Sequence, residues 1–151
     1  MGSNPSAFQG CKRCPVETVS WDEIQSFFER LNGGGKNNRL PSEAEWEFAA
    51  RGGNLGNGFQ LSGGDNWEEF AWTFKNSGNR TQPVALTVPN ELGLYDMSGN
   101  VREWVQDCWN ATYAGAPVDG SAWTDGDCSN RTIRGGSWYG KWNNVRVANR
   151  F

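Results

Sequence analysis

Apolar residues recur at helical spacing near the start of the chain, in "SWDEIQSFFERL" at residues 20–31. Steps of three and four residues place four apolar side chains on one face: Ile24, Phe27, Phe28 and Leu31. Ser20 stands directly before this stripe, Glu23 follows in the spacing of a capping box, and glycines at 33–35 end the pattern. The pattern predicts a helix over residues 20–31 with one apolar face.

A second stretch, "PSEAEWEFAARGG", has the same design. It begins with Ser42 and Glu45 in capping-box spacing and ends at two glycines, which predicts a helix over residues 42–51. The capping box accounts for the presence of Glu45. The remaining carboxylates, those of Glu43 and Glu47, are expected on the solvated face near the positive end of the helix dipole.

Beyond residue 53 the helical spacing disappears. Short apolar runs alternate with segments rich in Gly, Asn and Ser, which favour turns. Strands are predicted at residues 69–74 and 83–88, and the alternation in "TIRGGSWY" at 132–139 is typical of a third strand. Two early helices followed by short, mainly antiparallel strands indicate an α+β fold in a single domain over residues 1–151.

Aromatic residues and glycine are abundant, with 9 Trp, 8 Phe and 20 Gly in 151 residues. This much glycine favours many turns over a helical bundle. The net charge of -3 provides no general attraction to nucleic acid or to anionic membranes. No apolar run reaches the roughly 18 residues that a membrane-spanning helix needs. We therefore expect neither a nucleic-acid partner nor membrane insertion.

Histidine is absent, which excludes Ser-His and Cys-His nucleophiles and all His-ligated metal centres. Four cysteines remain: Cys11, Cys14, Cys108 and Cys128. The close pair in "CKRC" is compatible with half of a zinc site, a redox motif or a short disulfide. Two structural disulfides are the favoured interpretation, with zinc and free thiols as alternatives. Disulfides would indicate an oxidising compartment.

Three longer blocks form a recognisable pattern: "RLPSEAEWEFAARGG" at 39–53, "NELGLYDMSGNVREW" at 90–104 and "RTIRGGSW" at 131–138. Together with the "MGSNPS" segment ahead of the first helix, they resemble the formylglycine-generating enzyme family. The resemblance covers nearly the whole chain. It implies a variant of the C-type lectin fold.

The resemblance also implies enzymatic activities that these residues do not support. Sulfatase-activating members oxidise a substrate cysteine with two copper-bound cysteines that follow the Arg-Gly-Gly-Ser stretch, whereas residues 138–151 contain no Cys. The related iron-dependent sulfoxide synthases bind their metal through His, which this chain lacks. The thiolate is both metal ligand and redox group in the first reaction, and His is the metal ligand in the second. Because both are missing here, we expect no catalysis and no catalytic cofactor.

A third branch of the family fits "RGGSWYGKWNNVRVANRF" better. It resembles the C-terminal segment of the variable proteins of diversity-generating retroelements, in which adenine-directed mutagenesis changes ligand-contacting positions. The resemblance implies a variable segment at about 138–151, with candidate ligand-binding residues Tyr139, Gly140, Lys141, Trp142, Asn143, Asn144, Asn149 and Phe151. Tyr and Trp supply rigid contact area while Asn and Gly supply adaptable contacts, as in binding loops.

The remaining residues of this segment are expected to support it. Three apolar residues are predicted core, namely Trp138, Val145 and Val147, and three arginines are predicted to pair with carboxylates or backbone carbonyls, namely Arg134, Arg146 and Arg150. The ligand is expected to be a protein or cell-surface molecule, and a virion or cell surface the location. The first alternative is a fixed-sequence binding or structural member of the same family, and the second is an active formylglycine-generating oxidase.

The resemblance implies one further site, a structural calcium ion at "DMSGNVRE". Its ligands would be the side chains of Asp96 and Glu103 and the carbonyls of Gly99 and Val101. Ligands that are all oxygen and partly backbone suit calcium. The alternative is a tight turn in which Gly99 provides the backbone conformation and Asp96 caps it.

Overall fold

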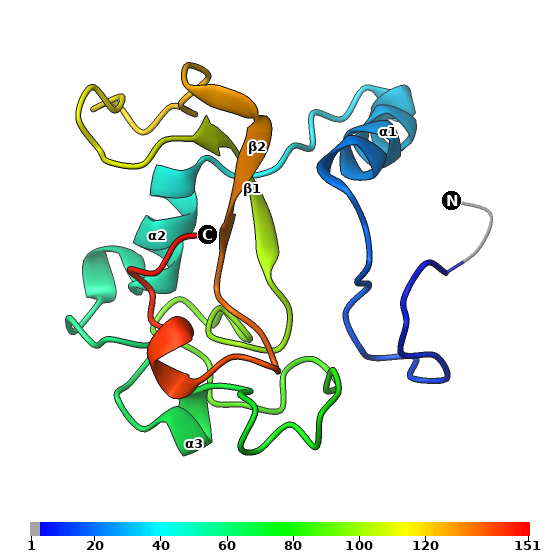
Figure 1. Cartoon of the computed structure of the whole chain (residues 1–151), viewed down its shortest axis with the longest axis vertical. Coiled ribbons are helices and arrows are strands. Elements are labelled where there is room, and N and C mark those ends of the chain that lie inside the picture. The colour runs from blue at the N-terminus through cyan, green and yellow to red at the C-terminus, as the bar shows by residue number, and fades with distance from the viewer. Residues whose placement is uncertain (1–3) are drawn as a thin grey trace.

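The structure, a computed structural model, describes residues 4–151 (Figure 1). Its helices and strands follow in the order α1 (Trp21–Leu31), α2 (Glu43–Ala50), α3 (Trp67–Phe70), β1 (Glu103–Trp109) and β2 (Asp127–Arg134). Short 3-10 turns occur at Asn32–Gly34, Gly53–Leu55 and Trp142–Asn144. The predicted α+β class is confirmed. None of the described helices is long and apolar enough to cross a membrane.

Local sequence determines where α1 and α2 begin. The Ser20 hydroxyl accepts a hydrogen bond from the Glu23 amide at 3.2 Å, and the Glu23 carboxylate accepts one from the Ser20 amide at 2.8 Å. Ser42 and Glu45 repeat both bonds at 3.0 Å and 2.8 Å. Each box satisfies amides that the first helical turn leaves without partners, which confirms both predicted starts.

The apolar face of α1 does not enter the core. No residue of α1 is buried, and Phe27 and Leu31 remain 43% and 42% exposed. Figure 1 shows α1 standing beside the sheet, apart from α2. Two indole hydrogen bonds attach its start to β1: Trp21 donates to the Val105 carbonyl, and Trp104 to the Val19 carbonyl, both at 3.1 Å.

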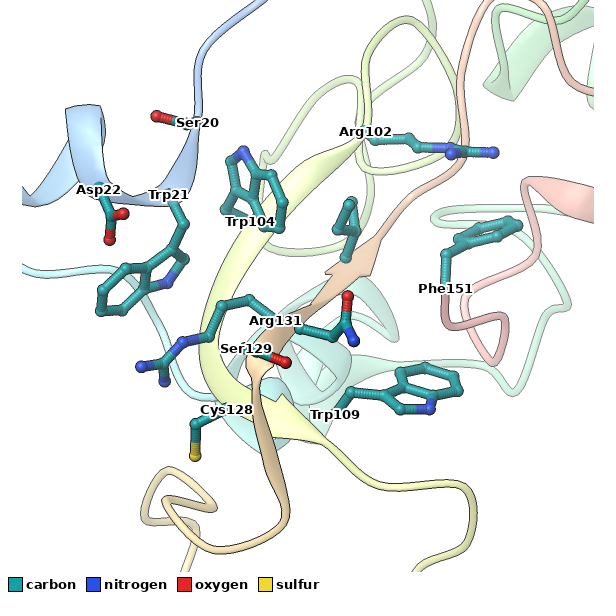
Figure 2. Close-up of a pocket in the computed structure, with 12 residues that line it drawn as sticks. Ser20, Trp21, Asp22, Arg102, Trp104, Trp109, Cys128, Ser129, Arg131 and Phe151 are labelled. Carbon is teal, nitrogen blue, oxygen red and sulfur yellow. The ribbon is translucent and has the colours of Figure 1, made fainter.

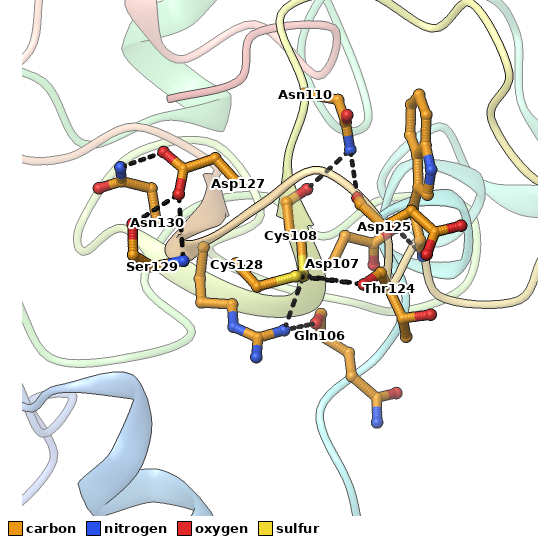
Figure 3. Close-up of a disulfide and its surroundings, with 12 residues drawn as sticks. Gln106, Asp107, Cys108, Asn110, Thr124, Asp125, Asp127, Cys128, Ser129 and Asn130 are labelled. Carbon is orange, nitrogen blue, oxygen red and sulfur yellow. Dashed lines mark hydrogen bonds between the residues drawn. A yellow bond between two sulfur atoms is a disulfide. The ribbon is translucent and has the colours of Figure 1, made fainter.

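The two strands form an antiparallel pair. Glu103 lies opposite Arg134 at one end and Trp109 opposite Asp127 at the other, with irregular register between them. A disulfide between Cys108 and Cys128 joins the strands at the second end, beside Asn110 and Asp127 (Figure 3).

The second predicted disulfide is also present. Cys11 and Cys14 bond to each other in the N-terminal segment, and no described cysteine is free. The structure therefore confirms the disulfide interpretation over the zinc and free-thiol alternatives.

Two predicted strands are wrong. Residues 69–74 contain the end of α3, which the Asn66 side chain caps by accepting from the Glu68 amide, and a single bridge between Trp72 and Gly99. Residues 83–88 form no strand, because their backbone bonds go to separate segments: the Val84 amide to the Arg13 carbonyl and the Val88 amide to the Glu69 carbonyl.

The third predicted strand is displaced, because β2 covers residues 127–134 instead of 132–139. It ends at Arg134 because Gly135 and Gly136 adopt φ angles of 81° and 72°, which turn the chain away from β1.

The core consists of two small clusters. One contains Trp46, Ala50, Val105 and Val147, and the other contains Leu61, Ala71 and Val145. The C-terminal run, residues 134–151, thus contributes a valine to each cluster, as predicted. Trp138 is only half-buried and packs edge-on against Phe8 with ring centroids 5.3 Å apart. It lies at the margin of the core rather than within it.

Candidate functional site

The C-terminal run leaves β2 and returns to the same strand. After the turn at the two glycines, it ends beside β2, where the Ile133 amide donates to the Phe151 carbonyl at 2.9 Å and the Phe151 amide to the Ile133 carbonyl at 3.1 Å. A Cβ atom on Gly136 would lie 2.6 Å from the Asn144 carbonyl oxygen, so the return path of the run requires glycine there. The run is therefore a closed loop based on one strand.

Side chains of this loop divide into an outer and an inner set. Tyr139 is 69% exposed and Trp142 is 50% exposed, and Lys141 and Asn143 are also exposed. The chain then turns inward at Val145, which is completely buried. Polar and aromatic side chains thus face solvent on a backbone anchored by apolar ones.

The backbone of the loop is fixed by bonds to distant segments. The Trp138 amide donates to the Asn100 carbonyl at 2.8 Å, and the Ser77 hydroxyl donates to the Trp138 carbonyl at 3.0 Å. The Phe74 amide donates to the Gly140 carbonyl at 3.0 Å. These bonds hold the loop in one conformation, which lowers the entropy cost of ordering it in a complex.

Arginine side chains support the loop from beneath, as predicted. Arg134 is fully buried and donates to Glu43 at 2.7 Å, to Glu47 at 2.5 Å and to the Val147 carbonyl at 2.6 Å. Arg150 reaches the other Glu43 oxygen at 2.6 Å. The expectation that Glu43 and Glu47 lie on a solvated face is wrong for Glu43, which is 5% exposed, because β2 brings a buried cation to it.

Arg146 has a more local role. Its guanidinium donates to the Asn143 carbonyl at 3.0 Å and to the Asn149 side chain at 3.1 Å. The Asn149 amide in turn donates to the Asn143 carbonyl at 2.7 Å. These bonds brace the turn at residues 142–144, so the side chain of Asn149 is occupied within the loop.

The structure brings most of the candidate residues together around a hollow of about 400 Å³. Its lining consists of Arg102, Ser137, Tyr139, Gly140, Lys141, Asn143 and Asn144. Trp142 lies on the same loop outside this lining, and Phe151 lies apart, beneath the guanidinium of Arg102. Arg102 was not among the residues singled out by sequence, since nothing in its local pattern separates it from other surface arginines.

A second, larger hollow of about 700 Å³ lies between α1 and the sheet (Figure 2). Trp21, Trp104 and Phe151 line it, and Arg131 stacks over the Trp21 ring at 4.0 Å. This hollow is rich in aromatic side chains, but Phe151 is the only candidate ligand-binding residue in its lining.

The calcium ligands implied by sequence flank Asn100 in the chain, with Asp96 and Gly99 before it and Val101 and Glu103 after it. One Asp96 oxygen accepts from the Ala85 amide at 2.8 Å, while the other is buried without a hydrogen-bond partner among residues 4–151. Burial raises the pKa of Asp96. Burial, with a smaller contribution from the charge of Asp96, also raises the pKa of Glu103 to about 7, although Trp46 donates to its carboxylate at 2.6 Å.

This environment fits a cation. The carboxylates of Asp96 and Glu103 are shielded from water and repel each other, which a bound cation would relieve. The buried Asp96 oxygen without a hydrogen-bond partner also indicates a missing partner. The carbonyls of Gly99 and Val101 accept no backbone hydrogen bond from the described residues. No cluster of three or more acidic, His or Cys side chains occurs within residues 4–151, so backbone oxygens would have to complete any such site.

Comparison with known proteins gives consistent matches over the whole chain. Residues 1–151 match the family described as sulfatase-modifying factor enzyme 1-like domain. The chaperone protein LppX of Paenibacillus barcinonensis is 33% identical over 98% of this chain and 67% of its own length. The formylglycine-generating enzyme of Streptomyces coelicolor is 35% identical over 82% of this chain, which spans only 42% of that enzyme.

Among solved structures, Treponema denticola variable protein 1 superposes with a TM-score of 0.85 at 32% identity. The match covers 100% of this chain and 72% of that protein. Both an enzyme and a variable protein are thus similar to this chain at comparable identity, so overall similarity alone does not distinguish their functions.

Proposed function

The chain belongs to the sulfatase-modifying factor family and has its C-type lectin-like fold, and from this premise we propose that it is a non-enzymatic member that displays a ligand-binding surface. One observation carries the proposal: Tyr139, Lys141 and Trp142 are exposed on a loop whose supports, Val145 and Arg134, are completely buried. Rigid aromatic side chains on a fixed backbone are what a binding surface requires.

The cysteines support this over an oxidase. All four described cysteines form disulfides, and none lies within residues 138–151. The Cys108–Cys128 bond joins the end of the sheet opposite to the glycine turn that opens the loop. A thiol-dependent oxidase needs reactive thiolates near its substrate site, and no cysteine is placed to supply one there.

We further propose that the loop is the diversified segment of a retroelement variable protein. The similarity to Treponema denticola variable protein 1 extends over the complete chain, including this loop. The separation of exposed from buried side chains in the loop also supports diversification, because exposed positions can change without altering the buried ones. A fixed-sequence binding member of the family remains the alternative.

The ligand proposed for this surface is a protein or another cell-surface molecule. Two disulfides favour a location outside the cytoplasm, where such ligands occur, on a cell or virion surface. The overall charge of -3 favours neither nucleic acid nor an anionic membrane as the partner.

A structural calcium ion is proposed at Asp96 and Glu103, with the carbonyls of Gly99 and Val101. The orphaned Asp96 oxygen supports this position. When bound, calcium would neutralise the two carboxylates, and the chain's own contribution is to hold them beside the turn that carries Asn100, whose carbonyl accepts from Trp138. Its role would be to stiffen the base of the loop.

The decisive experiment is amplicon sequencing of codons 131–151 from the source population, with codons 39–104 as the control. Variation confined to adenine positions of the loop codons is expected, at exposed positions such as 139 and 142 and not at 145 or 147. Invariance of both regions would contradict diversification. Oxidation of a cysteine-containing sulfatase peptide by the copper-treated protein would contradict the non-enzymatic assignment.

A further inference from the structure

The hollow beside Tyr139 is cationic, although the whole chain carries a net charge of -3. Arg102 and Lys141 are its charged side chains, and no Asp or Glu lines it. Neither side chain forms an ion pair with any of residues 4–151, whereas Arg134 pairs with Glu43 and Glu47, and Arg150 pairs with Glu43. The two cations of the hollow therefore remain available to an incoming group.

Arg102 is oriented by its surroundings. Its guanidinium lies 4.4 Å from the centre of the Phe151 ring, and Phe151 is itself fixed by two backbone bonds to Ile133 (Figure 2). Stacking on an aromatic ring positions a guanidinium while leaving the N–H donors at its edge unused. Arg102 is thus held by Phe151 at the border between this hollow and the larger one, both of which it lines.

The remaining lining of the hollow also supplies hydrogen-bond donors. Ser137, Asn143 and Asn144 line the same space, and each has a side chain able to donate a hydrogen bond. A guanidinium fork matches the two oxygens of a carboxylate, and a nearby ammonium and hydroxyl strengthen such binding. The chemistry of the hollow is that of a receptor for one planar anion.

We propose that this hollow binds an Asp or Glu carboxylate in an acidic segment of a protein partner, with Arg102 as the anchoring residue. The proposal rests on the proposed display function and specifies its ligand class. Arg102 lies outside residues 138–151, so it remains constant if the loop is diversified. A constant residue then sets the preference for an acidic partner, and the side chains at 139–144 select among acidic partners.

The arrangement favours a protein over a sulfated polysaccharide. Only two cations line the hollow, instead of the extended basic track that a polyanion follows. Tyr139 and Trp142 beside the hollow provide aromatic contact area of the kind found in protein interfaces. One carboxylate and adjacent apolar side chains therefore match the surface better.

The test is a selection from a random dodecapeptide library displayed on phage, performed on the whole protein and on variants. We expect peptides selected by the unaltered protein to be enriched in Asp and Glu, with Arg102→Gln reducing their binding about tenfold or more. Lys36→Gln is the matched control, because Lys36 is exposed in the turn after α1 and its loss changes the net charge equally. Arg102→Lys keeps the charge and loses the fork, so intermediate binding is expected.

The outcomes separate this inference from the function on which it rests. Selected peptides without acidic excess, or acidic peptides that bind Arg102→Gln undiminished, overturn the inference while the display surface stands. Selection of no peptide, together with binding of heparin, also overturns it in favour of a polyanion. Acidic peptides whose binding persists in a Tyr139→Ala, Trp142→Ala double variant contradict the display function itself.

Discussion

Arg134 and Glu43 form a buried ion pair, with 2.7 Å between Nη1 and Oε1, although they lie 91 residues apart in sequence. The pair connects the last residue of β2 to the first residue of α2. Arg134 also donates to the carbonyl of Val147, so the same side chain links sheet, helix and loop. A buried pair contributes little net stability by itself, but either charge is costly without its partner.

Glu43→Gln is therefore expected to reduce the free energy of unfolding by about 3–5 kcal/mol, because it leaves Arg134 and Arg150 without their shared carboxylate. Urea denaturation followed by tryptophan fluorescence measures this loss. Arg39→Gln is the control, since the Arg39–Glu45 pair is about half exposed and should contribute about 1 kcal/mol or less. Equal losses in the two variants would show that burial of the Arg134 pair is unimportant.

Truncation of the outer side chains of the loop should leave the fold intact. Tyr139→Ala and Trp142→Ala are each expected to change the free energy of unfolding by about 1 kcal/mol or less, because both side chains are at least half exposed. Val145→Ala should cost about 2 kcal/mol, since it removes fully buried methyl groups. Thermal and urea unfolding of the three variants provide the comparison, and a large loss with Tyr139→Ala would contradict the division into outer and inner sets.

The capping box of α2 should make stability depend on acidity. The hydrogen bond from Arg39, then the Ser42 amide, lower the pKa of Glu45 from 4.5 to about 2. A lowered pKa means that the native state holds fewer protons, so this stabilisation is complete above pH 4.5 and is lost as the pH falls toward 2. The pair is exposed, so the effect should stay below about 1 kcal/mol. Glu45→Gln should remove this pH dependence. Urea unfolding at several pH values from 6 to 2 measures it, and an identical change of the free energy of unfolding with pH in both proteins would disprove the prediction.

Calcium is expected to raise the melting temperature of the chelator-treated protein. Binding to the native state alone adds about 2.7 kcal/mol of stability at a ligand concentration 100 times the dissociation constant. Asp96→Asn should abolish the shift, because it removes the charge of the carboxylate that carries the orphaned oxygen. Asp119→Asn, in an exposed loop, should keep it. Calorimetry with calcium and with magnesium measures the effect, and an unchanged melting temperature in the unaltered protein would contradict the site.

Sequence predicted the features that depend on near neighbours. The starts of α1 and α2 follow from Ser20 and Ser42, whose partners lie three residues away. Tertiary contacts decided the rest. The 69–74 segment has the aromatic content of a strand, but Asn66 caps a short helix there and no neighbouring strand pairs with it.

The candidate site residues also divide into those that sequence could predict and those that depend on tertiary contacts. The exposure of Tyr139, Lys141, Trp142 and Asn143 could be predicted, because the resemblance to variable proteins is carried by one contiguous terminal segment. Arg102 and Glu43 could not, because their roles depend on Phe151 and Arg134, which the fold brings to them from distant segments. The apolar face of α1 is the opposite case, a clear pattern of which the structure leaves no residue fully buried.

The pairing of Ile133 with Phe151 has a consequence for length as well as for sequence. Since the loop starts and ends on neighbouring residues of β2, an insertion at its outer turn does not move either end. The closure cost of a flexible loop rises by only about 0.6 kcal/mol for each doubling of its length. β2 can therefore anchor a longer or exchanged loop without changing its own position. The distance to which the loop extends from the fold can then change independently of the side chains that it carries.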